Sequence, residues 1–344
     1  MKRWARRSKW LIVAYKVYQN WLMRRRFASG IIDSDHGSSH RGKSVAQSLS
    51  YIEEQFTDYL RYGGLSSPQL TGKTILELGF GDNAGVALKF LAAGAAKVVC
   101  VDKFFSRRDT AREQKIYLGL RESLQPEQRV RFDSAVKLDD GITFNETKLR
   151  LINGIDLEQA ASVLASEKIE FDLIISRAVI EEIFEPSRMF AAADNLLAPA
   201  GLALHKIDLS DYGIFSDGGM HPLTFLTIPD GIYRLMAKDS GIPNRKLMGY
   251  YRREMERLGY STRFLITGTV NRAPLVPHKE HLEPGVDFAP ETVALIEEIR
   301  PRLCKEFRDL PLEELLISGI FLLSEKPAQA QMLQAQPTNS AERS

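Results

Sequence analysis

The chain has little of several features that would place it in a specialised class. Only two of its 344 residues are cysteines, Cys100 and Cys304, and they lie too far apart in the sequence to match a metal or redox motif. The formal net charge is only +2, so the composition gives no reason to expect a specific nucleic-acid partner. Hydrophobic residues make up 44% and charged residues 26%, as in an ordinary globular protein. Nothing implies an oxidising compartment, so we expect a cytoplasmic protein.

Acidic residues are missing before Asp33, and the same region is rich in basic and aromatic side chains. Residues 1–27 contain nine lysines and arginines and all three tryptophans of the chain. The segment Trp10–Met23 is too short and too often interrupted to span a bilayer, and no small-residue cleavage site marks a signal peptide. We favour an amphipathic helix that lies on the inner face of an anionic membrane. A helix packed on the domain or on a second subunit, or an organelle transit peptide, fits the same pattern.

The most informative stretch is a strand that ends in a glycine turn. A short apolar strand carries Glu77 near its end and leads into Gly79-Phe80-Gly81. A helical run, Val86–Gly94, follows, and a second strand, Lys97–Val101, ends at Asp102. Glycines let a backbone approach a ligand closely, and a carboxylate at the second strand end can accept hydrogen bonds from two ribose hydroxyls. This unit therefore predicts a nucleoside-binding site.

Dinucleotide-binding proteins use a similar turn. Gly79, Gly81 and Ala84 match the G-x-G-x-x-G/A pattern of such proteins. Glu77 and Asp82, however, place negative charge where a pyrophosphate would bind. No Tyr-x-x-x-Lys pair lies nearby either. An NAD-dependent oxidoreductase is therefore the less favoured enzyme.

The turn more closely resembles the E/D-x-G-x-G motif of class I S-adenosylmethionine-dependent methyltransferases, although the third glycine is displaced to Gly85. In that family the acid of the motif, here Glu77, lies near the amino acid end of the sulfonium cofactor. The resemblance covers roughly Gly72–Pro327. It implies S-adenosyl-L-methionine as cofactor and a three-layer α/β Rossmann-like fold, with a mostly parallel seven-stranded sheet whose last strand is antiparallel.

Strand-like and helix-like runs alternate along the chain, as a parallel sheet requires. We expect a helix at 45–62 and strands at 149–152, 171–175, 202–207, 262–266 and 315–323, with Pro199-Ala-Gly201 as a turn. The expected domains are a basic amphipathic helix at 1–33, a linker and helix over the cofactor site at 34–71, the methyltransferase domain at 72–327 with a helical cap at 209–260, and a disordered tail at 328–344.

Ligands of open parallel sheets bind over the carboxyl ends of the strands. The strand ends of this chain supply acidic, basic and glycine residues that we expect to contact the cofactor. They are Glu77, Gly79, Phe80, Gly81, Asp102, Lys103, Ile155, Asp156, Ser176 and Arg177.

Transfer of a methyl group to a hydroxyl needs a group that accepts the proton of the hydroxyl. Asp208, at the end of the fifth strand, and His221, in the glycine-rich loop that follows, are the first candidates, and Glu181 is the reserve. Glu182 stands where the family often has a histidine. The spacing of these residues fits no metal motif, so we expect no metal.

We expect an O-methyltransferase acting on a saccharide, a glycolipid or another small molecule. In the cap, Asn244, Arg245 and Tyr250–Arg252 form a polar, basic and aromatic set that suits such an acceptor, or else a solvated helix face. A catalytically silent module of the same fold, which binds a partner or a membrane, is the alternative from outside the enzymes.

Overall fold

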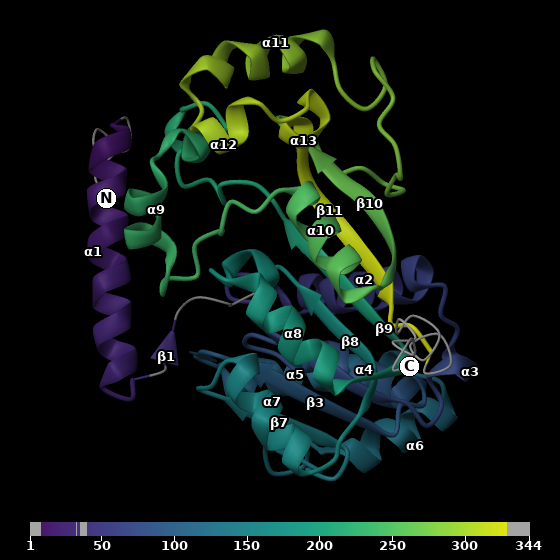
Figure 1. Cartoon of the computed structure of the whole chain (residues 1–344). Coiled ribbons are helices and arrows are strands. Elements are labelled where there is room, and N and C mark those ends of the chain that lie inside the picture. Colours follow the sequence, from purple (N-terminus) through teal and green to yellow (C-terminus); the bar gives the residue numbers. More distant parts are fainter. Residues whose placement is uncertain (1–7, 32, 35–39, 329–344) are drawn as a thin grey trace, which may run out of the picture.

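The computed structural model describes residues 8–31, 33–34 and 40–328 of the chain. Its centre is a sheet of seven strands: β2 (Thr74–Leu78), β3 (Lys97–Asp102), β7 (Leu149–Asn153), β8 (Phe171–Arg177), β9 (Leu197–Asp208), β10 (Ser261–Thr269) and β11 (Ile317–Glu325). Their order across the sheet is β10-β11-β9-β8-β2-β3-β7 (Figure 1). β11 is antiparallel to both of its neighbours, whereas the pairs from β9 to β7 are parallel. The predicted α/β fold is therefore confirmed, including its antiparallel last strand.

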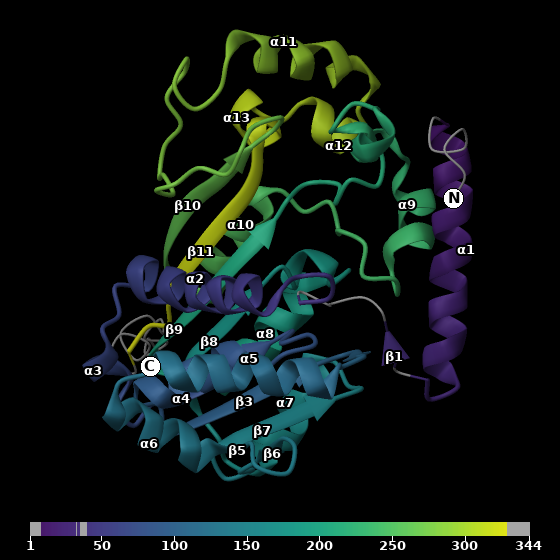
Figure 2. The ribbon, with the colours of Figure 1, turned by 180° about the vertical axis from the view of Figure 1, so that it is seen from behind.

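Helices cover both faces of the sheet. One face carries α2 (Val45–Gly63), α4 (Gly85–Ala93), α5 (Thr110–Ser123) and α6 (Pro126–Ala135) (Figure 2). The other carries α7 (Leu157–Ser166), α8 (Pro186–Leu196) and α10 (Met248–Leu258) (Figure 1). Side chains of a strand alternate between the faces, so Leu76 and Leu78 of β2 pack with the second group of helices while Ile75 packs with the first.

Local sequence explains where the helices that frame the strand ends begin. Ser44 and Gln47 form a reciprocal capping box at the start of α2, and Gly64 ends the helix in a left-handed conformation. Asp109 and Asp156 cap α5 and α7 by accepting backbone N–H groups. A proline in the first turn of α6 separates it from α5.

One expected boundary is wrong. The stretch Pro199-Ala-Gly201 was expected to be a turn before the fifth strand, but it lies inside β9. Ala200 donates its N–H to the carbonyl of Lys326 at 3.1 Å, and Gly201 accepts the N–H of Lys326 at 3.0 Å. Pairing with the chain beyond β11 therefore extends this strand through a local turn signal.

Two helical segments extend the sheet at its β10–β11 side. The first, between β9 and β10, holds η3 (Ser216–Gly218), η4 (Thr224–Thr227), α9 (Asp230–Ala237) and α10. The second, between β10 and β11, holds α11 (Pro290–Ile299), η5 (Arg300–Arg302), α12 (Lys305–Arg308) and α13 (Leu312–Leu316). The sequence predicted only the first of these segments. The remaining short elements are α3 (Ser67–Leu70), η2 (Ile180–Glu182) and the hairpin of β5 (Val136–Lys137) and β6 (Thr143–Phe144).

The N-terminal helix α1 (Lys9–Ala28) stands at one side of the molecule and packs along α9 (Figures 1 and 2). Ile12 and Val13 are buried in this contact, and the side chain of Asn20 accepts the N–H of Asp239 at 2.8 Å. Beyond α1, the short strand β1 (Asp33–Ser34) pairs with β4 (Phe105–Ser106), next to the end of β3. None of the helices in the described part of the chain is long and apolar enough to cross a bilayer. The expected disordered tail lies outside the described residues, except for Ala328.

Candidate active site

The glycine turn after β2 lies at the centre of the site. Gly79 and Gly81 have φ angles of +68° and +62°, which side chains disfavour. A Cβ atom on Gly79 would stand 2.2 Å from Cγ2 of Val179, and the N–H of Gly79 bonds to the carbonyl of Val101 at 2.8 Å. The turn is therefore fixed against both the end of β3 and the segment that follows β8.

Gly79→Ala is expected to unfold more easily than the wild type and to weaken ligand binding at the turn. The left-handed backbone costs a side chain about 1–2 kcal/mol, and contact with Val179 adds to this cost. Gly72→Ala is the matched control, because Gly72 has a φ of +79° with nothing within 4 Å of the added Cβ. The unfolding temperature should fall in the order wild type, Gly72→Ala, Gly79→Ala. Adding Val179→Ala to Gly79→Ala should recover part of the lost stability. Equal losses in the two single variants would contradict the close contact.

Asp102 joins the second strand to the glycine turn. Its two carboxylate oxygens accept the N–H groups of Gly81 and Phe104, both at 3.0 Å. Burial raises the pKa of the carboxyl group, and the two backbone hydrogen bonds oppose this rise. Each oxygen keeps a further lone pair, so the side chain can still accept hydrogen bonds from the hydroxyls of a ligand.

Two adjoining cavities flank the turn. The first has a volume of about 260 Å³ and lies beside Asp102, Lys103 and Asp156. The second has a volume of about 220 Å³ and lies between α2 and the ends of β2 and β8. Leu78, Gly79 and Glu182 line both cavities. The two cavities therefore meet at Gly79 and Glu182.

The structure brings most of the expected cofactor residues to these cavities. Lining residues among them are Gly79, Asp102, Lys103 and Asp156 in the first cavity, and Glu77, Gly79, Phe80 and Arg177 in the second. Gly81 contributes the N–H that Asp102 accepts. Ile155 packs against the apolar core. Ser176 is buried inside the sheet, where its hydroxyl bonds to Nδ1 of His205 at 2.8 Å.

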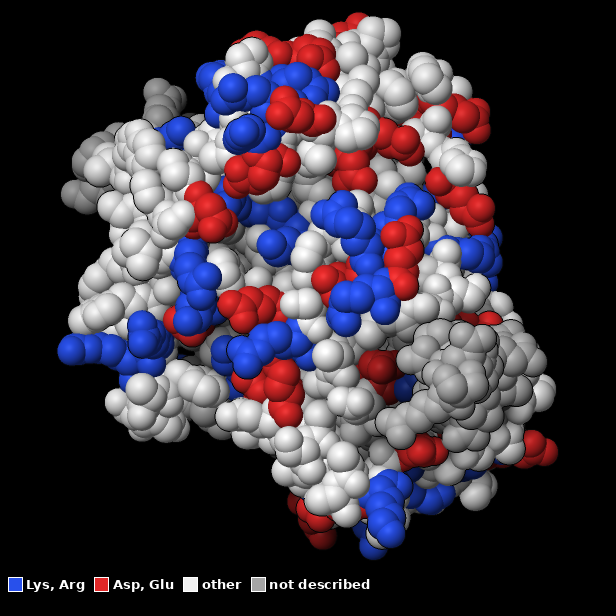
Figure 3. Space-filling view, in the orientation of Figure 1, with Lys and Arg blue, Asp and Glu red and all other residues white. Residues whose placement is uncertain are grey.

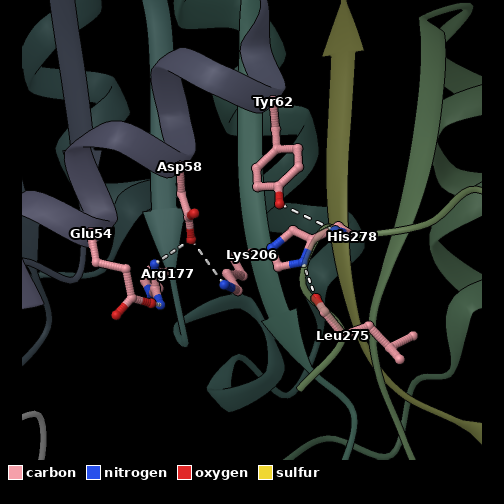
Figure 4. Close-up of polar contacts among 7 residues, drawn as sticks. All are labelled: Glu54, Asp58, Tyr62, Arg177, Lys206, Leu275 and His278. Atoms are coloured by element: carbon pink, nitrogen blue, oxygen red, sulfur yellow. Dashed lines mark hydrogen bonds and ion pairs between the residues drawn. The ribbon is translucent and has the colours of Figure 1, made fainter. Parts of the chain in front are cut away.

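Arg177 is held in the second cavity by two acidic residues of α2 (Figure 4). Asp58 bonds to Arg177 and to the neighbouring Lys206, at 3.0 Å in each case, and Glu54 bonds to Arg177 at 2.9 Å. These contacts fix the guanidinium group and fasten α2 across the ends of β8 and β9. Arg177 therefore supplies an oriented cation to a cavity that the acidic residues Glu77 and Glu182 also line.

A second contact fastens the far end of α2 to the segment after β10. The rings of Tyr62 and His278 stack with their centroids 4.3 Å apart, and the Tyr62 hydroxyl accepts the N–H of His278 at 3.1 Å (Figure 4). Nδ1 of His278 lies 2.8 Å from the carbonyl oxygen of Leu275. The segment that the sequence left unassigned thus helps to hold the helix that roofs the second cavity.

Carboxyl groups with raised pKa values surround the region where the cavities meet. Burial raises the pKa of Glu77 to about 7 and that of Glu181 to about 8. Burial, together with the charges of Glu181 and Asp102, also raises the pKa of Glu182. Such a concentration of acids favours a ligand that brings a positive charge.

Glu181 lies behind the second cavity and reaches it through Tyr212. One oxygen of its buried carboxylate accepts the hydroxyl of Tyr212 at 2.7 Å and the N–H of Asp208 at 2.9 Å. Tyr212 lines the second cavity with a φ of +53°, and Ala178 does so with a φ of +55°. Non-glycine residues in this conformation are strained and often mark functional sites. Burial and the nearby acids raise the pKa of Tyr212, so the phenol holds its proton and donates it to Glu181.

The other two predicted proton acceptors are placed differently. Asp208 accepts the N–H of Ser210 at 2.8 Å at the end of β9 and does not line either cavity. His221 lies in the cap, where its ring nitrogens contact the carbonyl of Leu295 and the N–H of Leu223, both at 2.9 Å. The glycine-rich loop therefore turns His221 towards α11, and of the three candidates only Glu181 bonds to a side chain that lines the second cavity. In the described part of the chain, no group of three or more His, Cys, Asp or Glu side chains could hold a metal ion.

Asn244 and Arg245, from the polar set that the sequence indicated in the cap, form buried hydrogen bonds within the protein. Asn244 is buried and donates to the carbonyls of Ile180 and Ile183 at 2.9 and 2.8 Å. Arg245 is buried as well and bonds to the carbonyl of Ile228 at 2.6 Å. Asn244 ties the cap to the segment after β8, whereas Arg245 bonds within the cap, and neither side chain lines either cavity.

Several lining residues were not predicted. Tyr51, Gln55 and Tyr59 of α2 face the second cavity, and Glu182 lies between the two cavities. The spacing of four residues places the three α2 side chains on one helix face, which is a signal that the sequence contained. The hydrophobic pattern places Tyr59 on the buried face of the helix, and it does not indicate which way the side chain of Gln55 points.

Comparisons with known proteins give only distant likenesses. No protein-family model matches the sequence, and no curated protein matches it. Similar solved structures include the CurJ carbon methyltransferase, at 11% identity and a TM-score of 0.38, covering 92% of this chain and 67% of the other. A phosphoethanolamine N-methyltransferase 2 from Haemonchus contortus is 13% identical with a TM-score of 0.40, covering 80% of this chain. This chain spans only 52% of that enzyme. An S-adenosylmethionine-dependent methyltransferase from Mesorhizobium loti is 13% identical with a TM-score of 0.37, covering 80% of this chain and 100% of the other.

The strand order decides the fold. A dinucleotide-binding sheet runs in the order 3-2-1-4-5-6. Here an antiparallel last strand is inserted beside the fifth strand, and the sixth forms the sheet edge. This is the class I methyltransferase fold. The fold assignment rests on this topology and on the glycine turn after β2.

Proposed function

We propose that the protein is an S-adenosylmethionine-dependent methyltransferase whose cofactor occupies the two adjoining cavities. The observation that carries the proposal is the placement of Asp102 and Glu77 on opposite sides of the turn at Gly79, each lining one cavity. Asp102 offers lone pairs to ribose hydroxyls in the first cavity. Burial raises the pKa of Glu77 to about 7. An ammonium or sulfonium group that enters the second cavity would pair with the carboxylate of Glu77 and favour its ionised form.

Further residues of the chain suit the two ends of this cofactor. Arg177, fixed by Glu54 and Asp58, can pair with the carboxylate of its amino acid end. Asp156 lies at the other end, on the rim of the first cavity next to the start of α7. When bound, the cofactor supplies an electrophilic methyl group.

A hydroxyl that accepts this methyl group must lose its proton, and the pair Tyr212–Glu181 can take it. Tyr212 contacts the acceptor hydroxyl, receives its proton and passes its own proton to the carboxylate of Glu181. Because the pKa of Glu181 is raised to about 8, a substantial fraction of this side chain changes its protonation state near neutral pH, as a general base requires. This pair supports methylation of a hydroxyl.

The groove beside Tyr212 suggests the kind of acceptor. It has a volume of about 370 Å³ and lies between α1 and two loops of the cap, one with Tyr212 and one with Gly241. Lys16 and Gln19 give it polar walls, while Leu22 and Ile242 give it apolar walls. A saccharide joined to an apolar portion, as in a glycolipid, or another small amphiphilic molecule fits these walls.

The outward face of α1 supports a peripheral position on an anionic membrane. Large apolar and aromatic side chains are exposed on this face: Trp10, Leu11, Tyr15, Tyr18 and Trp21. In Figure 3 this side of the molecule is largely free of charged side chains, and lysines and arginines gather at its lower end. Arg25 and Arg26 lie in the last turn of the helix. Aromatic rings beside cations suit a headgroup region with negative charge.

Replacing Trp10, Tyr18 and Trp21 together by alanine is expected to lower binding to vesicles that contain phosphatidylglycerol at least about tenfold, because each ring that enters the interface contributes on the order of 1 kcal/mol. Co-sedimentation at low salt measures the effect, and affinity for S-adenosylhomocysteine should stay unchanged. Val130→Ala, which removes an exposed apolar side chain from α6, is the control. Equal sedimentation of all three proteins would contradict the membrane proposal. Deletion of α1 is unsuitable, because it would uncover the buried contact with α9.

Transfer of a labelled methyl group tests the proposed activity. The protein is incubated with S-adenosylmethionine labelled in its methyl group and, separately, with lipid and polar extracts of cells. We expect label in a molecule that carries a new methyl ether. Binding of the cofactor without transfer to any extract would favour a silent binding module, and binding of NAD in its place would favour an oxidoreductase.

A further inference from the structure

A third cavity, of about 250 Å³, lies beside Asp82 and Asn83, which follow the glycine turn. It is lined by the cationic side chains Arg41, Arg107, Arg108 and Arg112 and by His40. His40 and Asn83 line the second cavity as well, so the two cavities adjoin. The cavity lies at the first turn of α5, where backbone N–H groups add positive potential.

Among the residues that line this cavity, several buried polar atoms have no hydrogen-bond partner. Nε and Nη2 of Arg112 are buried without a hydrogen-bond partner, and so is Nη2 of Arg108. These two atoms of Arg112 form one edge of the guanidinium group, which is the edge that binds two oxygens of a carboxylate or a phosphate side by side. His40 is only 7% exposed, and its Nδ1 is buried without a partner. Because unpaired buried donors destabilise a fold, the group of them points to an oxyanion that completes it.

Three acidic residues, Asp82, Asp109 and Glu113, line the cavity as well, and the last two are held in other contacts. Glu113 bonds to Nη1 of Arg108 at 3.1 Å and accepts the hydroxyl of Tyr117. Asp109 caps α5 by accepting the N–H of Arg112 at 3.1 Å. Neither of these acids reaches the free edge of the Arg112 guanidinium group, and the cavity keeps more cations than anions among its lining residues.

We propose that the third cavity binds an oxyanion, either a carboxylate or a phosphate group, that belongs to a molecule other than the cofactor. The carboxylate of the cofactor has its own cation, Arg177, in the second cavity. An oxyanion in the third cavity would bridge Arg112 of α5 and His40, which precedes α2, across the glycine turn. This inference rests on the proposed function in one respect: if the methyl acceptor supplies the anion, the acceptor is an acidic molecule. A free anion would instead link the start of α2 to α5.

Titration of the full-length protein with inorganic phosphate at constant ionic strength tests the site. Phosphate is expected to raise the unfolding temperature of the wild type in a saturable manner, and Arg112→Gln should lower the affinity at least about tenfold. Arg112→Lys keeps the charge but loses the two-donor edge, so its affinity for phosphate should lie between those of the wild type and Arg112→Gln. Arg121→Gln is the matched control, because Arg121 lies on the same helix with its guanidinium group exposed and paired with Asp133. Identical titrations of wild type, Arg112→Gln and Arg121→Gln would overturn the proposal.

A second comparison distinguishes the cofactor from another molecule as the source of the anion. S-adenosylhomocysteine carries a carboxylate, whereas 5′-methylthioadenosine lacks the amino acid end. If the site is independent of the cofactor, Arg112→Gln leaves the affinities for both nucleosides unchanged, and saturating S-adenosylhomocysteine does not displace phosphate. Loss of affinity for S-adenosylhomocysteine alone, together with displacement of phosphate, would assign the cavity to the cofactor and overturn the proposal. Failure of the wild type to bind either nucleoside would instead count against the proposed function, and the phosphate titration would still decide the anion site.

Discussion

Glu181→Gln is expected to lower the rate of methyl transfer by about 10²–10⁴-fold, the usual effect of removing a general base. The glutamine keeps an oxygen that can accept the hydroxyl of Tyr212 and the N–H of Asp208, so the local hydrogen bonds survive while the capacity to take a proton is lost. Turnover with the identified acceptor is the measurement. Affinity for S-adenosylhomocysteine should remain that of the wild type, because Glu181 does not line either cofactor cavity.

The dependence of turnover on pH gives a separate test of Glu181. Its folded-state pKa is raised to about 8, so the ionised form that accepts a proton grows as the pH rises through about 8 and is lost below it. Wild-type turnover should therefore increase with pH up to this region. Tyr212→Phe should show a loss on the same scale as Glu181→Gln, because it breaks the contact between the cavity and the base.

Asp208→Asn and His221→Ala serve as comparisons for the proposed base. The ring of His221 contacts backbone groups of the cap, and Asp208 accepts a backbone N–H at its own strand end. We expect both variants to keep most of the turnover. A loss in either that equals the loss in Glu181→Gln would return that residue to the role of base, and full activity of Glu181→Gln would remove Glu181 from it.

Asp102→Ala is expected to weaken binding of S-adenosylhomocysteine at least about tenfold, since hydrogen bonds to a charged acceptor contribute roughly 1.5–3 kcal/mol each. The alanine also removes the contacts with the N–H groups of Gly81 and Phe104, which hold the turn in place. Asp102→Asn keeps one acceptor oxygen and should lose less affinity. Titration calorimetry on each variant measures the difference.

Asp172→Ala is the matched control for Asp102→Ala. Asp172 also belongs to the central sheet and also accepts a backbone N–H, that of Thr74 at 2.8 Å, but near the start of β2 rather than at the carboxyl ends of the strands. The affinity of the Asp172→Ala variant for S-adenosylhomocysteine should match that of the wild type. Equal affinities in Asp102→Ala and wild type would show that the end of β3 does not hold the ribose.

The sequence predicted those parts of the fold that depend on local patterns. The hydrophobic spacing of α2, the glycine turn after β2 and the alternation of strands with helices all depend on residues close together in the sequence, so each is readable without a partner segment. The long strand β9 was predicted too short because its first residues depend on pairing with the chain after β11. Long-range pairing of this kind overrides a local turn signal.

The structure brings predicted site residues together where the strand order fixes their positions, and it separates them where the direction of a side chain depends on a distant segment. Glu77, Asp102 and Arg177 stand at the ends of adjacent parallel strands, so topology alone brings them to the same edge of the sheet. The direction of His221 depends on α11, which belongs to a segment that the sequence left unassigned. Nothing in the local pattern around this histidine specifies that contact.

The central claim, that the two adjoining cavities form a cofactor site, is tested most directly by titration calorimetry of the wild-type protein with S-adenosylhomocysteine and, in parallel, with NAD. We expect saturable binding of one molecule of S-adenosylhomocysteine per chain and no binding of NAD under the same conditions. Binding of NAD alone, or of neither compound by a folded protein, would contradict it.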